Sequence, residues 1–295
     1  MKDDPLFRRI RQHAGKRLVL SDAENDGERL AMLKGFVRLE NEMLKRYHRK
    51  GDSGLRVTKA RAIIMDVIIE NLHLRASERC KQECKKPAPF CIVANGGYGR
   101  GEMNPHSDVD LMFLYPTGWT DSKTEAQREI VTREILYPLW DSGFKVGHSS
   151  RTWKDALAEC KKDERTRNAL LDSRRICGSR RLADKFFRKF RRFLRKDDPA
   201  RRLYELRQKQ RTRRKEYGGT VFIQTPDIKN GVGGLRDYQG VLWMCGPRHD
   251  CGPPPCHSAS SGWLEDARYH VFVFMHGVLP GVFESVIGVD DLAHL

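Results

Sequence analysis

The sequence of 295 residues contains no apolar run of about eighteen residues or more, the length that a helix needs to span a membrane. Residues 1–4 also lack the apolar stretch of a secretory signal. These two absences predict a cytoplasmic protein without a membrane partner. Hydrophobic residues make up 39% and charged residues 32% of the chain, which is typical of one or two soluble domains.

The eight cysteines include no Cys-x-x-Cys pair, so neither a zinc knuckle nor a disulfide framework is indicated. They fit a reducing compartment instead. Residues 245–262 hold three cysteines and two histidines among four prolines. A zinc site there is conceivable, but the spacing does not favour one.

Two short blocks carry the chemistry. The first is NGGYGRG at residues 95–101, after an apolar run at 90–94 that reads as a buried strand. The second is SDVDL at residues 107–111, at the start of another apolar run. Because strand side chains alternate between faces, Asp108 and Asp110 are expected on one face, about 6 to 7 Å apart.

Two carboxylates on one strand face can hold a hard cation such as Mg²⁺. The glycines let the backbone approach a bulky anion closely and offer N–H groups to it. Either block alone is more often a solvated strand end or an ordinary turn. Together, in this order, they indicate a site for a metal-bound triphosphate.

Residues 96–111 resemble the nucleotidyltransferase superfamily that shares the DNA polymerase β palm, and more narrowly the PII uridylyltransferase family. Two later blocks are similar to segments of that family, VGHSSRT at residues 146–152, which is a strand in the family, and GVGGLRD at 231–237. Three matching blocks in the same order make the narrower resemblance specific. It covers roughly residues 90–244.

The resemblance implies an α+β fold, a polymerase-β-like nucleotidyltransferase palm with a small mixed sheet flanked by helical segments. It implies transfer of UMP from UTP to a tyrosine of a PII-type nitrogen regulatory protein, with pyrophosphate released by in-line attack. Asp108 and Asp110 would be catalytic and bind Mg²⁺. The expected nucleotide-binding residues are Gly96, Gly97, Arg100, Ser107, Lys229 and Arg236. For Arg100 a structural salt bridge is an equal alternative.

The chain departs from the family pattern at two points. Residues 225–227 read Thr-Pro-Asp where family members carry Glu-Pro-Asn. Many superfamily members also place a third carboxylate on a neighbouring strand, where Gly147 and His148 stand here. His148 is read as a structural histidine. The substitutes for the third carboxylate are Asp141, Asp172 and Asp237, and none is compelling from the sequence.

Helical periodicity is expected before and after these strands. Residues 21–24 read as a capping box, followed by apolar stripes on two helices that are separated by a break at 51–54. Residues 125–140 also read as a helix. From residue 174 to 217 there are nineteen lysines and arginines against five acidic residues, an excess of fourteen positive charges that is nearly all of the formal +16.

This basic segment is predicted to form two amphipathic helices whose apolar side packs and whose basic side faces water. Two functional alternatives remain. The charge can steer the triphosphate or an acidic protein partner, or it can bind nucleic acid through phosphates. Because the apolar residues follow a helix stripe, a stacking platform for single strands is disfavoured.

The predicted organisation is a helical segment at 1–86, a catalytic domain at 87–172, a basic helical region at 173–244 and a divergent or truncated tail at 245–295. Either divergence or a disrupted reading frame explains that tail. Full-length family members carry a phosphohydrolase domain and ligand-sensing modules, which nothing here resembles, so no uridylyl-removing activity is expected. Two other functions remain open, an inactive remnant of the enzyme and a nucleic-acid-binding or RNA-modifying protein.

Overall fold

A computed structural model describes residues 4–20, 25–118, 121–220, 224–225 and 227–245. The chain divides into two compact units, Met1–Lys196 and Asp197–Leu295, and each is described by itself. The stretch with cysteines and histidines at 245–262 lies outside the described residues, apart from the backbone of Cys245. None of the described helices combines the length and the apolar character needed to cross a bilayer.

The first unit begins with three helices, α1 (Pro5–Arg17), α2 (Asp26–Arg49) and α3 (Gly54–Glu83). The predicted break at 51–54 is confirmed, and Gly51 turns the chain there with φ of +93°. The predicted capping box at 21–24 lies outside the described residues. Asn25 caps α2 instead, since its side-chain oxygen accepts a hydrogen bond from the Glu28 N–H at 2.9 Å.

Four strands form one mixed sheet in the order β3-β2-β1-β4. β1 pairs antiparallel with both β2 and β4, while β2 pairs parallel with β3. The three strands predicted from the sequence are present. The bounds are β1 Cys91–Ala94, β2 Val109–Tyr115, β3 Val146–Thr152 and β4 Arg174–Gly178.

The sequence did not predict β4, because its residues RRICG have no clear alternation and open the basic run that reads as helical. It completes the sheet by pairing with the edge of β1 that β2 leaves open. The first unit therefore continues through β4 and α9 (Arg180–Arg195) to Lys196, whereas the predicted domain boundary fell at residue 172. The α+β class is as predicted.

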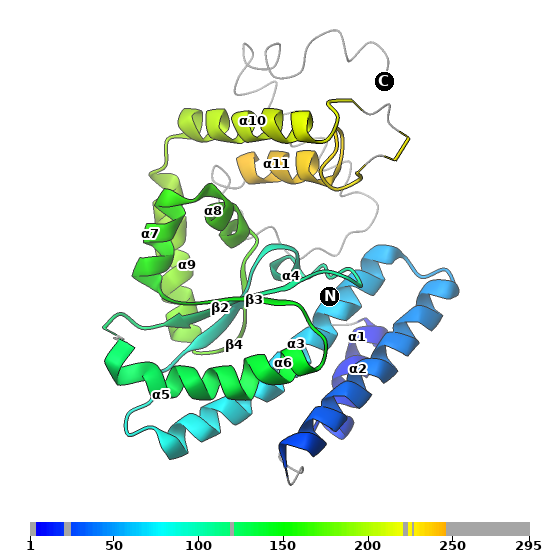
Figure 1. The fold of residues 1–295 in the computed structure, drawn as a ribbon, viewed down its shortest axis with the longest axis vertical. Helices are drawn as coiled ribbons and strands as arrows, with labels where there is room; N and C mark the ends of the chain where they lie inside the picture. The colour runs from blue at the N-terminus through cyan, green and yellow to red at the C-terminus, as the bar shows by residue number, and fades with distance from the viewer. Residues whose placement is uncertain (1–3, 21–24, 119–120, 221–223, 226, 246–295) are drawn as a thin grey trace. The chain divides into compact units, whose positions relative to one another are not determined.

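Helices lie on both sides of the sheet (Figure 1), and each face of the sheet has its own apolar core. On one face Ile92, Leu111 and Phe113 pack with the helices α1 to α3. On the other face Met112 and Leu114 pack against α7 (Trp153–Lys162), α8 (Glu164–Leu171) and α9. The alternation of strand side chains produces this division, because successive residues of β2 belong to different cores.

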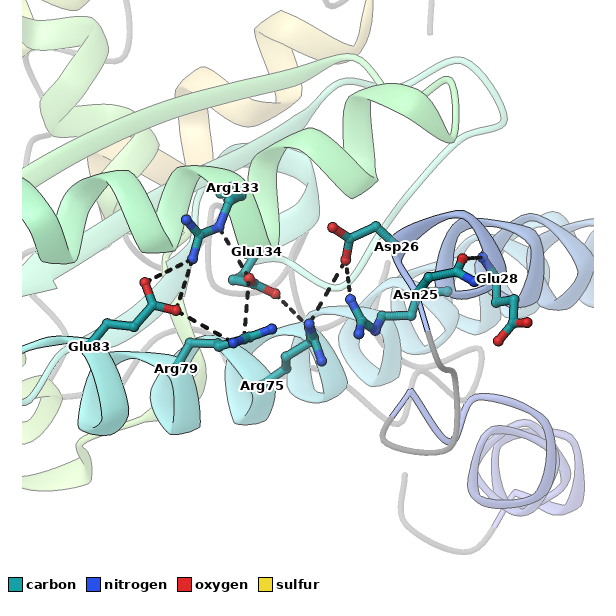
Figure 2. Close-up of polar contacts among 9 residues, drawn as sticks. Asn25, Asp26, Glu28, Arg75, Arg79, Glu83, Arg133 and Glu134 are labelled. Atoms are coloured by element: carbon teal, nitrogen blue, oxygen red, sulfur yellow. Dashed lines mark hydrogen bonds and ion pairs between the residues drawn. The ribbon is translucent and has the colours of Figure 1, made fainter.

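The predicted helix at 125–140 is present as a continuous helical stretch that changes its winding. It consists of α5 (Asp121–Val131), a π-helical turn (Thr132–Leu136) and α6 (Tyr137–Asp141). Glu134 in the π turn is buried and accepts hydrogen bonds from Arg75 at 2.6 Å and from Arg133 at 3.3 Å (Figure 2). A buried carboxylate needs such partners. The hydrogen bond from Arg75 joins the π turn to α3.

The second unit contains α10 (Pro199–Glu216) and α11 (Leu235–Cys245), joined by a glycine-rich segment. Asp237 holds these parts together. Its carboxylate accepts hydrogen bonds from the Gly233 N–H at 2.9 Å, from Gln210 at 3.0 Å, and from Arg213 and Arg214. The block at 231–237 therefore ends in a helix that is tied to α10.

Candidate active site

The two candidate catalytic carboxylates lie at the start of β2. Val109 is fully buried, while Asp108 and Asp110 on either side of it are exposed. This burial pattern is the alternation that the sequence predicts, with both carboxylates on the side opposite Val109. Asp110 thus shares a sheet face with Met112, which is the face covered by α7, α8 and α9.

Two glycines from distant parts of the chain lie beside the Asp110 carboxylate, and Gly147 makes room for it. Gly147 of β3 pairs directly with Asp110, and a Cβ atom added to Gly147 would be 2.6 Å from Asp110 Oδ1. A Cβ atom added to Gly96 would be 3.5 Å from Oδ2. A side chain at Gly147 would therefore obstruct the carboxylate, whereas a Cβ at Gly96 would only touch it at an ordinary van der Waals distance.

The glycine block forms a short helical turn, α4 (Gly96–Gly99), between β1 and β2. Gly96 has φ of +55°, a conformation that most other residues avoid. A Cβ on Gly99 would be 2.2 Å from the carbonyl oxygen of Asp172, so only glycine permits this approach to α8. The Asn95 N–H donates to the carbonyl oxygen of Asp110 at 3.0 Å and joins the turn to β2.

A buried polar cluster connects this turn to α3 and β4. The Tyr98 hydroxyl donates to Asp66 Oδ1 of α3 at 2.8 Å, and Arg174 of β4 donates to both oxygens of Asp66 at 2.7 and 3.0 Å. Burial and the neighbouring Asp66 carboxylate raise the pKa of Tyr98 well above its ordinary value. Sequence reasoning missed this cluster, and the only local signal for it was Tyr98 between the glycines.

Arg100 forms the structural salt bridge that the sequence left as an alternative. Its Nη1 donates to Asp172 Oδ2 at 2.6 Å, and its Nε donates to Glu102 at 3.2 Å. Burial lowers the pKa of Arg100, but the Asp172 and Glu102 carboxylates outweigh that effect and raise it. The ion pair joins the glycine turn to the end of α8, and a phosphate-binding role for Arg100 stays a prediction.

Ser107 closes the turn that leads into the carboxylate pair. Its hydroxyl accepts a hydrogen bond from the Asn104 N–H at 3.1 Å, and its own N–H donates to the Asn104 carbonyl oxygen at 3.1 Å. The Gly97 backbone lies close to the same loop, because a Cβ there would be 3.3 Å from the Glu102 carbonyl oxygen. Gly96, Gly97, Ser107 and the carboxylates are thus gathered in one segment of the first unit.

No third carboxylate joins Asp108 and Asp110 within the described part of the chain, where no group of three or more possible metal-binding side chains occurs. The register places Ser149 on Asp110's face and His148 on the opposite one, where its ring lies 5.7 Å from Trp140. Asp172 is engaged by Arg100. The other two substitutes lie elsewhere, Asp141 at the exposed end of α6 and Asp237 in the second unit.

The two remaining predicted residues belong to the second unit. Lys229 lies in a turn capped by Asp227, whose carboxylate accepts the Lys229 N–H at 2.8 Å. Arg236 donates to Gln239 at 3.0 Å, and its guanidinium lies 5.8 Å from the centre of the Trp243 ring. Asp227, where the resemblance implies an asparagine, stabilises this turn through its side chain. Nucleotide contacts from these residues stay predictions.

Comparison with known proteins adds an independent result. A family model described as GlnD PII-uridylyltransferase matches residues 201–272, and one described as glutamate-ammonia ligase adenylyltransferase matches residues 57–141. The first match extends past Met244 into the range 245–295. The second covers the glycine block and the carboxylate pair.

Curated relatives match most of the chain, and all three described here are named bifunctional uridylyltransferase/uridylyl-removing enzyme. The protein from Erythrobacter litoralis is 30% identical over 94% of this chain and 31% of its own length. That from Novosphingobium aromaticivorans is 34% identical over 69% of this chain and 22% of its own. The protein from Cereibacter sphaeroides is 38% identical over 62% of this chain and 19% of its own length. The chain thus spans less than a third of the length of each of these relatives.

Proposed function

This chain belongs to the bifunctional uridylyltransferase/uridylyl-removing enzyme family and covers its N-terminal part, and from that premise we propose that it carries the nucleotidyl-transfer activity of the family. In this proposal the sheet with its flanking helices is a polymerase-β-like palm. The observation that carries the proposal is the paired position of Asp108 and Asp110 at the start of β2, with Asp110 seated between Gly96 and Gly147.

The donors at this site fit a magnesium ion. Mg²⁺ prefers oxygen ligands and is commonly held by one or two carboxylates together with substrate phosphates and water. Asp108 and Asp110 supply two such carboxylates, and the absence of a Cβ atom at Gly147 leaves the position of Asp110 Oδ1 unobstructed. When bound, the metal neutralises phosphate charge and lowers the pKa of an attacking hydroxyl.

The chain's own residues position the nucleotide in this proposal. Gly96 and Gly97 present backbone N–H groups to the triphosphate, and the glycine turn keeps its place through Tyr98 and Arg100. Such preorganised donors lower the barrier because they need not reorient during the reaction. Asp108 and Asp110 would hold the metal beside the reacting groups, and the acceptor hydroxyl would give up its proton to solvent as its oxygen bonds to the α-phosphorus and the bond to pyrophosphate breaks.

The substrates follow from the family and not from the geometry alone. We take the nucleotide to be UTP and the acceptor to be a PII-type protein, as the description of the matched family model suggests. The resemblance of the sequence blocks adds the expectation that the acceptor group is a tyrosine hydroxyl. The alternative is a protein that keeps the fold without the activity. The observation that favours this alternative is that no third carboxylate joins the pair among the described residues.

The test uses the full chain with UTP labelled at the α-phosphate, Mg²⁺ and a PII protein. We expect transfer of label to PII, loss of transfer in the Asp108→Asn/Asp110→Asn variant, and normal transfer in Asp141→Asn. Asp141 is a matched control because it is an exposed carboxylate at the end of α6. If the unaltered protein labels PII no better than the double variant does, the alternative of an inactive remnant holds.

A further inference from the structure

The outer side of α9 carries a stripe of positive charge. Its members are exposed, and their spacing of three and four residues places them along one side of the helix. The basic stripe consists of Arg181, Lys185, Arg188, Lys189 and Arg192. The opposite side is apolar and buried, with Phe186 and Phe190 packed in the sheet core. The predicted amphipathic helix is confirmed here.

Nothing else in the described structure neutralises this stripe. None of its five members forms an ion pair with a described residue, and the one carboxylate of α9, Asp184, lies 3.8 Å from Arg180 beside the stripe. Like charges spaced four residues apart on a helix weaken it. An anionic surface laid against the stripe would remove that repulsion.

Two lysines of the stripe are held in place by an aromatic ring. The ammonium groups of Lys185 and Lys189 lie 5.6 and 5.8 Å from the centre of the Trp153 ring, and Lys154 approaches it at 5.9 Å. Cations at this distance are attracted by the ring's quadrupole. Trp153 therefore gathers three positive charges at the start of α7. It also restricts the three lysine side chains beforehand, so that they lose less conformational entropy when a partner binds.

The stripe belongs to the same side of the sheet as the candidate active site. The apolar side of α9 covers Met112 and Leu114 of β2, which point to the same face as Asp110. Both features are within the first unit. A large partner bound on α9 thus lies against the layer of helices that covers the catalytic face.

We propose that the basic stripe and Trp153 form the docking surface for an acidic face of the protein that accepts the nucleotide. This inference rests on the proposed transferase function. Charge complementarity of this kind speeds encounter and selects partners. A protein is favoured over a nucleic acid because Phe186 and Phe190 are buried, and the Trp153 ring already faces three lysine ammonium groups, which compete with bases for stacking on it.

The test compares two charge-matched variants of the full chain. One is Lys185→Gln/Arg188→Gln/Lys189→Gln/Arg192→Gln. The control removes four exposed charges from α2, with Lys34→Gln/Arg38→Gln/Arg46→Gln/Arg49→Gln. Binding to the PII protein of the same organism is measured by biolayer interferometry at low and high salt, and UMP transfer is measured in parallel. Thermal melting checks that both variants fold.

We expect the α9 variant to bind PII at about one tenth of the normal association rate or less at low salt. The difference should vanish at high salt, and kcat at saturating PII and KM for UTP should not change. The α2 variant should match the unaltered protein. The proposal is overturned if the two variants bind PII alike or if the unaltered protein does not bind PII. Binding of a single-stranded RNA oligonucleotide is measured in the same way, and the proposal is also overturned if the α9 variant loses RNA binding but keeps PII binding. PII binding without UMP transfer would refute the transferase function and leave the docking surface standing.

Discussion

The carboxylate of Asp110 lies directly over Gly147, its partner in the parallel pair β2–β3. A Cβ atom at Gly147 would approach Asp110 Oδ1 to 2.6 Å, closer than such atoms come in proteins. The two residues are far apart in the sequence, and the sheet register alone brings them together. Gly147 therefore sets the position of a candidate catalytic carboxylate without contributing a side chain.

Replacing Gly147 with alanine should lower activity without lowering stability. The new methyl group would push the Asp110 side chain aside, and displacement of a reacting group by about 1 Å can cost about 100-fold in rate. Glycine within a strand is less favourable than alanine by roughly 0.5–1 kcal/mol, so the melting temperature should stay the same or rise. Label transfer from UTP and thermal melting measure the two effects.

Gly35→Ala is the matched control for this substitution, because a Cβ added at Gly35 in α2 meets no atom within 4 Å. It should leave transfer unchanged. Full activity of Gly147→Ala would contradict the positioning role of Gly147.

Removing either partner of the Arg100–Asp172 ion pair should destabilise the first unit by similar amounts. Asp172→Asn or Arg100→Met breaks this ion pair and leaves the remaining charge poorly solvated, with Glu102 still beside Arg100 in the first variant, a loss of about 3 kcal/mol for a buried pair. Because both changes remove the same interaction, the double variant should cost at least about 1 kcal/mol less than the sum of the two single variants. Urea unfolding of the four proteins measures this coupling.

The same variants separate an anchoring role of Arg100 from contact with phosphate. If Arg100 is an anchor, KM for UTP should rise alike in Asp172→Asn and Arg100→Met. A rise in KM that is confined to Arg100→Met, with additive stability changes, would assign Arg100 to the nucleotide.

Mild acid should destabilise the fold through His73. Burial, with a smaller effect from the Arg175 charge, lowers the pKa of His73 from 6.5 to about 4. Between pH 6.5 and 4 the histidine is protonated in the unfolded chain but not in the folded one. The contribution of His73 to the free energy of unfolding is therefore fully present above about pH 6.5 and is lost as the pH falls toward 4. At about pH 4.5 this loss amounts to about 2 kcal/mol.

The comparison with His73→Gln isolates this contribution from those of other groups. Urea unfolding near pH 7 and near pH 4.5 should show the unaltered protein losing about 2 kcal/mol more than the variant between the two conditions. Equal losses in both proteins would show that His73 does not govern the acid sensitivity.

Local sequence determined the parts of the site that depend on neighbours along the chain. The alternation around Val109 placed Asp108 and Asp110 on one face, and the glycine block predicted a tight turn before them. The amphipathic character of α9 was likewise readable, because side-chain periodicity follows directly from backbone geometry. The strand at residues 146–152 was expected from the family resemblance and not from periodicity.

Tertiary structure alone decided what depends on pairing between distant segments. The strand β4 forms because β1 has an open edge, whereas its own sequence reads as part of a basic helical run. Arg100 binds Asp172, 72 residues away, which no local pattern specifies. The position of the Asp110 side chain against Gly147 results from the register of the strands β2 and β3. The sequence thus determined which residues can do the chemistry, and long-range packing decided which groups hold them in place.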